Sequence, residues 1–260
     1  MSLEIARQSS RPAPVRGLTI VAAIPAFNTE PYIAGVVTAA RRHVSQVVVI
    51  DDGSSDSTAA AARAAGALVI SHDRNRGYGE ALRTACQWAR ANAVDILVTL
   101  DGDGQHDPDE IPRLIDLIIN READIVIGSR FLSPGRPAGR DNGYGGMPGY
   151  RRFGIRLVTR LFNLGSRLKI SDSQSGLRAY NKSICQGLNP TETGMSISLE
   201  ILEQARDMGA VIREVPTSCY YGPSRLSRHA FKHGLGLVLA LYRMRLRRWL
   251  RRSKHARPAG

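Results

Sequence analysis

Residues 94–106 read Val-Asp-Ile-Leu-Val-Thr-Leu-Asp-Gly-Asp-Gly-Gln-His. The apolar part, Val94 to Leu100, has the length of a buried strand, so the acidic part, Asp101 to His106, follows at its carboxyl end. Glycines between carboxylates let bare backbone approach a ligand, while hard oxygen atoms hold a divalent cation that in turn binds phosphates. A hairpin turn is the alternative, because Asp-Gly is a common turn dipeptide. The stretch alone is compatible with both a turn and a nucleotide-diphosphate site.

Two earlier apolar runs also end in polar residues. Gln46 to Ile50 is followed at once by Asp51-Asp52, and Leu18 to Ile24 is followed by a segment that reaches Glu30. Asp56 has a plain explanation as a cap of the next helix, and Glu30 as an acid in a first helical turn. Asp51-Asp52 has no such explanation, which favours a ligand site.

Strand and helix periodicity alternate along the first half of the chain. They predict strands at 18–24, 46–51, 67–71, 94–100 and 124–128, with helices at 31–43, 57–65, 78–92 and 109–121 between them. This alternation is typical of an α/β fold with a mostly parallel central sheet and helices on both faces. Ligands bind beyond the carboxyl ends of such strands, so we expect the three polar strand ends at one edge.

The second half of the chain is organised differently. Residues 133–149 are rich in glycine and proline, and they predict a mobile functional loop that closes over substrate. Helices near 150–168 and 196–208, a strand at 211–215 and a helix over 229–250 are expected after it. We therefore divide the chain into a disordered leader (1–17), one large domain (18–228) and a basic amphipathic helix with its tail (229–260).

The net charge of +13 on 260 residues is concentrated at the C-terminal end. From Arg243 to Arg257 there is no acid, and basic residues alternate with Leu246, Trp249 and Leu250. A basic amphipathic helix of this kind is expected to bind an anionic membrane surface. The alternative is a helix that packs on the main domain. Nucleic acid is not expected, because Trp249 stands without an interleaved aromatic platform.

Cysteine usage and hydropathy indicate the compartment. Cys86, Cys185 and Cys219 show no metal-ligand or redox spacing, which suits a reducing cytosol. The first seventeen residues carry no apolar stretch of a secretory signal, and the best apolar run, Gly234 to Tyr242, is about half of the roughly 20 residues that a membrane span requires. We expect a cytoplasmic protein associated peripherally with the cytoplasmic face of the membrane.

Several motifs together carry a resemblance to a known family. They are Pro25-Ala-Phe-Asn-Thr-Glu30, Asp51-Asp-Gly-Ser54 with Asp56 and Thr58, Asn75-Arg-Gly77, Asp101-Gly-Asp-Gly-Gln-His106 with Pro108, Gly128-Ser-Arg130 and Ser175-Gly-Leu-Arg178. In this order and spacing the chain resembles a family two inverting glycosyltransferase of the GT-A fold, over about Leu18 to Leu239. The most similar branch is the dolichol-phosphate mannosyltransferase type, which glycosylates polyprenyl (dolichyl or undecaprenyl) phosphates.

The resemblance implies a set of site residues. Asp103 and Gln105 would bind Mg²⁺ or Mn²⁺, and Asp101, Asp103 and Arg151 would act in catalysis. Nucleotide-sugar contacts would come from Pro25, Phe27, Glu30, Ile50, Asp52, Asp101, Gly102, Asp103 and Arg225. Arg151 and Arg178 would bind the acceptor phosphate, for which a bidentate guanidinium is suited. Phe27 stands where the family more often has tyrosine.

Departures from the family pattern affect the expected phosphate clamp. A family arginine shortly before the Ser224-Arg225 pair is absent, and Cys219 or Tyr220 holds its place. Arg130 is expected to anchor a loop or to bind a ligand. The segment from Asn75 to Glu80 is weak evidence for a dinucleotide loop, because its third glycine is missing.

Other functions remain to be compared with this one. A glycosyltransferase acting on a soluble or glycan acceptor is the main alternative, and a metal-dependent phosphatase using Asp101 and Asp103 is another. A processive synthase would show a Gln-x-x-Arg-Trp motif, but Arg245 stands where that glutamine belongs before Arg248-Trp249. A nonenzymatic scaffold would not need three acidic strand ends. GDP-mannose, UDP-glucose and UDP-N-acetylhexosamine all stay open as donors, as does a separate membrane partner protein.

Overall fold

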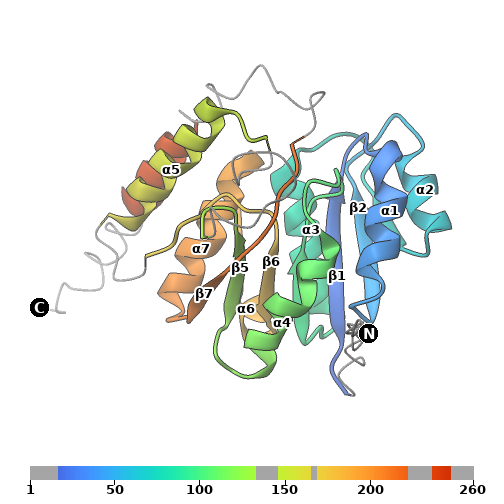
Figure 1. Ribbon diagram of the computed structural model, residues 1–260, viewed down its shortest axis with the longest axis horizontal. Helices are drawn as coiled ribbons and strands as arrows, with labels where there is room; N and C mark the ends of the chain where they lie inside the picture. Colours follow the sequence, from blue (N-terminus) through green and yellow to red (C-terminus); the bar gives the residue numbers. More distant parts are fainter. Residues whose placement is uncertain (1–16, 133–145, 165–168, 222–235, 247–260) are drawn as a thin grey trace, which may run out of the picture.

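The computed structural model describes residues 17–132, 146–164, 169–221 and 236–246, and within them a central sheet has helices on both faces (Figure 1). Seven strands form this sheet in the described part of the chain. They are β1 (Ile20–Ala26), β2 (Gln46–Asp51), β3 (Leu68–Ser71), β4 (Ile96–Thr99), β5 (Ile125–Ser129), β6 (Arg178–Asn181) and β7 (Ile212–Pro216).

The strand order is β3-β2-β1-β4-β6-β5-β7. β6 runs antiparallel to both β4 and β5, and every other pairing is parallel. The mostly parallel α/β sheet predicted from the sequence is confirmed, while β6 was not predicted. The strand order reverses between β1 and β4, and in open α/β sheets such a switch point is where ligands bind.

The predicted helices are present with ends shifted by a few residues. They are α1 (Glu30–Ala40), α2 (Thr58–Ala64), α3 (Tyr78–Ala91), α4 (Ile111–Ile119) with η1 (Pro108–Glu110) before it, α5 (Gly149–Asn163) and α7 (Ile197–Asp207). α6 (Lys182–Gly187) and η2 (Gly194–Ser196) were not predicted. The expected leader lies almost wholly outside the described residues, as do 133–145 of the expected mobile loop and both ends of the expected C-terminal helix.

Two hydrophobic cores lie on the two faces of the sheet. Successive side chains of a strand point to opposite faces, so Val21 of β1 joins one core and Ala22 the other. The first core is covered by α3, α5, α6 and α7, and the second by α1, α2 and α4. Because the central strands are buried on both faces, their sequences are apolar throughout, which is why periodicity found them.

Residues 236–246 form a helix that lies beside α5 (Figure 1). Its Leu241 is buried in the first core, and Arg245 Nη2 donates to the carbonyl oxygens of Phe162 and Leu164, both at 2.8 Å. The described part of the C-terminal helix therefore packs on the domain, as the alternative interpretation proposed. Within the described ranges, no helix has the length and apolar character needed to cross a bilayer.

Candidate active site

The three polar strand ends meet at the switch point. β1 lies between β2 and β4 in the sheet, and all three run in the same direction. Beyond the ladders, Asp52 N donates to Ala26 O (2.8 Å), and Gly102 N donates to Pro25 O (3.2 Å). The prediction that these segments share one edge of the sheet is confirmed.

Glycines shape the acidic segment that follows β4. A Cβ on Gly102 would lie 3.2 Å from the side chains of Ala26, Ile24 and Ile33, so this glycine lets the backbone pass close to the core. Gly104 has a φ of +70°, in the left-handed region that favours glycine. The turn at Gly104 returns the chain so that the residues on either side of it come together.

Asp103 and Gln105 meet across this turn. Gln105 N donates to Asp103 Oδ1 (3.0 Å) and Gln105 Nε2 donates to Asp103 Oδ2 (2.6 Å). Gln105 Oε1 faces the Cys219 thiol, with Sγ at 4.0 Å. The segment carrying Cys219 is held there by an isolated antiparallel bridge to His106 and by Tyr220 N, which donates to Gln105 O (2.8 Å). Cys219 thus contacts a predicted metal ligand.

The donor set suits a hard divalent cation. A carboxylate and an amide oxygen are oxygen ligands, and Mg²⁺ is commonly held by one or two carboxylates with waters and substrate phosphates completing its shell. Among the described residues, no three His, Cys, Asp or Glu side chains are grouped so that they could hold a metal ion by themselves. For Gln105 to share a cation with Asp103, its amide must turn so that Oε1 faces Asp103; Nε2 would then face Cys219, whose sulfur accepts weakly.

Asp101 occupies a crowded place at the end of β4. Its side chain is about one-third exposed, and its Oδ2 lies 3.7 Å from His106 Nε2. The Tyr78 hydroxyl also donates to this carboxylate. Desolvation raises the pKa of Asp101, while Arg130, Arg151 and Arg178 act in the opposite direction. A Cβ on Gly176 would lie 2.4 Å from Asp101 Oδ2, so only glycine leaves room for the carboxylate.

His106 is a buried, neutral imidazole beside this carboxylate. Burial and the nearby Arg130 charge lower its pKa to about 4, so it carries no charge at neutral pH. Its Nδ1 has no hydrogen-bond partner among the described residues. His106 therefore lies beside Asp101 as an uncharged side chain.

Asp52 anchors the loop before α3. Its two oxygens accept from Arg76 N (2.9 Å) and Gly77 N (2.7 Å), and its Oδ1 lies 2.7 Å from His72 Nδ1. His72 Nε2 in turn lies 3.0 Å from Thr84 Oγ1. This buried network occupies the carboxylate that was predicted to contact the base or ribose, so the structure gives Asp52 a loop-positioning role.

Glu30 and Asp56 cap each other's helices. Glu30 Oε2 accepts from Ser57 N (3.0 Å), and Asp56 Oδ2 accepts from Glu30 N (3.2 Å). Asp56 Oδ1 also accepts from Thr58 N (3.0 Å) at the start of α2. The capping explanation of Asp56 is confirmed, and the local structure accounts for Glu30 in the same way.

The other predicted nucleotide contacts divide by exposure. Phe27, at the end of β1, is exposed and available to a ring. Pro25 and Ile50 are buried within the sheet, and their contact with the nucleotide stays a prediction. Arg225 lies outside the described residues.

The predicted phosphate-binding arginines also differ. Arg178 is 1% exposed, and its guanidinium donates to the carbonyl oxygens of Ser173, Ser175 and Ser198 (2.8–3.1 Å). These contacts hold the guanidinium of Arg178 inside the protein, and its binding of the acceptor phosphate stays a prediction. Arg151, in the first turn of α5, is partly exposed, and its Cζ lies 5.0 Å from the centre of the Tyr221 ring.

Arg130 anchors the loop that follows β5. Its Nε and Nη2 form a bidentate ion pair with buried Asp172 (2.6 and 2.8 Å), and its Nη1 donates to the Tyr221 hydroxyl (2.9 Å). Desolvation acts to raise the pKa of Asp172, but Arg130 outweighs it and the pKa is lowered. Glu214 of β7 supports this segment by accepting from Asp172 N (3.1 Å). The anchoring interpretation of Arg130 is the one that the geometry favours.

Comparison with known proteins places this arrangement in a family. The sequence model described as "Glycosyl transferase family 2" matches residues 21–187, which include all three strand ends. The chain belongs to glycosyl transferase family 2. This family 2 chain is 38% identical over 123 residues to the UDP-N-acetylglucosamine–dolichyl-phosphate N-acetylglucosaminyltransferase of Methanococcus voltae, covering 47% of this chain and 46% of that one.

Two further relatives extend the comparison. The family 2 chain is 31% identical over 230 residues to the uncharacterized protein MJ1222 of Methanocaldococcus jannaschii, covering 85% of this chain and 90% of that protein. It is 32% identical over 151 residues to the dolichol-phosphate mannosyltransferase of Pyrococcus furiosus, covering 57% of this chain and 39% of that one. The chain thus spans less than half the length of the two relatives named as transferases.

A solved structure confirms the fold class. Glucosyl-3-phosphoglycerate synthase from Mycobacterium tuberculosis, solved with Mn²⁺, UDP and phosphoglyceric acid, superposes with a TM-score of 0.65 at 21% identity, covering 86% of this chain and 78% of that one. The GT-A fold predicted for this family 2 chain is therefore confirmed. The phosphatase alternative gains no support from any of these matches.

Sequence reasoning missed several contacts around the family 2 site. Tyr78, Gly176, Asp172 and Tyr221 were not identified as site residues, although each contacts Asp101 or Arg130 directly. The sequence marks two of these residues by their position in the motifs. Gly176 lies within Ser175–Arg178, and Tyr78 follows Gly77.

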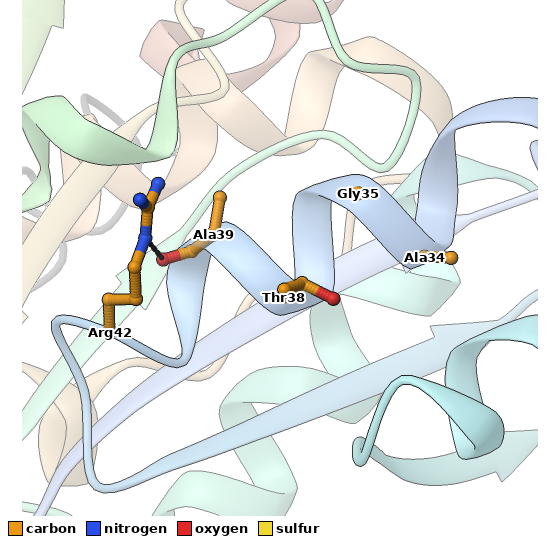
Figure 2. A pocket seen from close by; sticks show the side chains of 5 residues that line it. All are labelled: Ala34, Gly35, Thr38, Ala39 and Arg42. Atoms are coloured by element: carbon orange, nitrogen blue, oxygen red, sulfur yellow. Dashed lines mark hydrogen bonds between the residues drawn. The ribbon is translucent and has the colours of Figure 1, made fainter.

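A hollow elsewhere on the surface is not part of this site. It has a volume of about 440 Å³ and lies on the outer side of α1, lined by Ala34, Gly35, Thr38, Ala39 and Arg42 (Figure 2). Its one charged group, Arg42, pairs with Asp109 at 2.8 Å. The hollow is open and offers no carboxylate, so it is not a candidate for the family's chemistry.

Proposed function

We propose that this protein transfers a sugar from a nucleotide-sugar donor to a polyprenyl phosphate, with inversion at the anomeric carbon. The observation that carries the proposal is the cluster of Asp101, Asp103 and Gln105 at the switch point of a family 2 fold, with Arg151 beside it. Two relatives named as dolichyl- or dolichol-phosphate glycosyltransferases support the lipid phosphate as acceptor class.

Asp103 and Gln105 are the residues that would hold Mg²⁺ or Mn²⁺. When bound, such a cation neutralises the charge that develops on a nucleoside-diphosphate leaving group, without proton transfer. The neighbour solved with Mn²⁺ and UDP supports this metal class. Asp101, held between Tyr78 and Gly176, would orient the donor sugar next to these ligands. Phe27, exposed at the end of β1, is placed to contact the nucleotide.

Arg151 would receive the acceptor phosphate. A monoalkyl phosphate has a second pKa near 6 and is largely dianionic at neutral pH, so it can attack without a strong general base. The pKa of His106 is lowered to about 4, so its imidazole is a weak base, and the direct attack of a dianionic phosphate does not require one. A single displacement of this kind inverts the anomeric configuration.

We further propose that the enzyme works at the cytoplasmic face of a membrane as a peripheral protein, with or without a separate membrane partner protein, and does not bind nucleic acid. Its acceptor is a lipid, so the site must come close to a bilayer surface. The arginine-rich and acid-free sequences of α5 and residues 236–246 favour an anionic surface.

The test is a panel of donors and acceptors. Purified protein is incubated with Mn²⁺ or Mg²⁺ and with either a short-chain polyprenyl phosphate or phosphoglycerate as acceptor. GDP-mannose, UDP-glucose and UDP-N-acetylglucosamine are supplied in turn as donors. Release of nucleoside diphosphate is measured, and NMR gives the anomeric configuration of the product. Asp103→Asn should abolish release, whereas Asp109→Asn, on the exposed Arg42 pair, should not. Release with phosphoglycerate but with no lipid phosphate would overturn the acceptor assignment.

A further inference from the structure

α5 presents a row of large apolar side chains to the outside of the molecule. Tyr150, Phe153, Leu157 and Leu164 are all exposed, and Phe153 keeps 69% of its surface accessible. Tyr150, Phe153 and Leu157 are spaced by three and four residues, so they lie on one face of the helix, and Leu164 follows directly after its end. The opposite face, with Val158 and Phe162, is buried in the core, so the outer row is not part of that core.

The neighbouring helix 236–246 adds a second row. Leu239, Tyr242 and Leu246 are exposed at the same spacing, while Leu241 packs inward. Arg245 ties this helix to the end of α5 through the carbonyl oxygens of Phe162 and Leu164. These two rows contain half of the large hydrophobic side chains that are exposed in the described ranges: seven of fourteen. We call Tyr150, Phe153, Leu157, Leu164, Leu239, Tyr242 and Leu246 the apolar rows.

The charges on both helices are of one sign. Neither α5 nor residues 236–246 contain an aspartate or glutamate, and together they carry six arginines, at 151, 152, 156, 160, 243 and 245. An apolar face flanked by arginines is the composition of helices that lie in the plane of a membrane interface. It complements an anionic lipid surface, to which each nearby arginine contributes about 1 kcal/mol.

We propose that the apolar rows lie against an anionic bilayer surface. The inference rests on the proposed function, which it deepens by saying where the acceptor's membrane lies. Tyr150 begins the α5 row one residue before Arg151, whose guanidinium stacks on Tyr221 at the site. A lipid phosphate bound at Arg151 would therefore keep its hydrocarbon chain on the side of the bilayer.

A second copy of the chain fits the same face poorly. In a twofold dimer the same patch meets itself, so the arginines of one copy would face those of the other. Neither helix contains an acid of its own. Arg243 and Arg245 lie 3.7 and 4.0 Å from Glu192 and Glu203 of the same copy. Like charges in such an interface repel, whereas anionic lipid headgroups attract the arginines of both helices.

The experiment measures binding of the full chain to vesicles of phosphatidylcholine with and without phosphatidylglycerol, by flotation. Phe153→Gln with Leu157→Gln should lower the partition coefficient about tenfold or more, because two apolar side chains no longer enter the lipid. Arg160→Gln should lower it about fivefold on anionic vesicles and leave neutral vesicles unaffected. The matched control is Leu68→Gln with Val211→Gln, two exposed apolar residues in β3 and just before β7, away from the apolar rows.

Thermal unfolding checks that each variant is folded, and light scattering gives the oligomeric state. Wild-type-like flotation of the Phe153/Leu157 variant, or an equal loss in the control, would overturn the inference. So would a stable dimer that this variant dissociates. Turnover of a short water-soluble acceptor phosphate should be unchanged in the variant. Wild-type protein that floats but glycosylates no lipid phosphate would instead overturn the proposed function alone.

Discussion

Replacing Gly176 with alanine should damage catalysis without unfolding the protein. The new Cβ would lie 2.4 Å from Asp101 Oδ2, and an ordinary contact begins at 3.4 Å, so the carboxylate has to move by about 1 Å. Gly176 cannot yield easily, because its carbonyl oxygen accepts from Thr99 Oγ1 (3.0 Å) in the adjacent strand. A 1 Å misplacement of a reacting group costs about 100-fold in rate, so we expect kcat to fall by about that factor.

The stability of the Gly176→Ala variant should change little. The φ of Gly176 is not in the left-handed region, so alanine can adopt the same backbone conformation. Overpacking costs about 1–3 kcal/mol. Part of this cost is offset because alanine makes the unfolded chain less flexible than glycine does. Nucleoside diphosphate release gives kcat, and urea unfolding gives stability. Gly35→Ala is the control, since its Cβ meets nothing within 4 Å. Unchanged kcat in a folded Gly176→Ala protein would show that the position of Asp101 does not matter.

Three further outcomes follow from the same contacts. Asp172→Asn leaves the buried Arg130 charge unpaired, so urea unfolding should show a loss of about 3–5 kcal/mol, while Asp172→Leu with Arg130→Met should lose much less. The pKa of Asp172 is lower in the folded than in the unfolded protein, so the ion pair should stabilise the fold above pH about 3.8, and this stabilisation should be lost as pH falls through the folded-state pKa. The free energy of unfolding, measured against pH for wild type and Asp172→Asn, tests this expectation. Identical pH profiles would contradict it. Asp103→Asn should weaken Mn²⁺ binding at least about 100-fold in a direct titration, and an unchanged affinity would remove Asp103 from the metal site.

The fold was predictable because its central strands are buried on both faces. Such strands read as short apolar runs, and the polar residues that end them stand out, as at Asp51 and Asp101. β6 was missed because Arg178 and Asn181 interrupt any apolar run in a strand of four residues. The guanidinium of Arg178 finds its partners in carbonyl oxygens of the surrounding loops, which no periodicity reports.

The site was predictable where it is local and not where it is assembled across the chain. Asp103 and Gln105 are two residues apart, and one glycine turn brings them together. The thiol of Cys219 reaches Gln105 across 114 residues of sequence, and Asp172 reaches Arg130 across 42. These contacts depend on how β5 and β7 pair at the edge of the sheet, so only the structure shows them.

The long-range contacts also connect the chemistry to the proposed membrane face. Asp172 forms an ion pair with Arg130, which donates to the Tyr221 hydroxyl. The guanidinium of Arg151, in the first turn of α5, stacks on the Tyr221 ring. Each step joins a buried group to a more exposed one, so the buried ion pair sets the position of an arginine at the surface. In the proposed function Arg151 meets a phosphate that arrives from a bilayer, and such support helps because a preformed position lowers the entropy cost of binding. The same helix turn thus belongs to the site through Arg151 and to the outer surface through Tyr150.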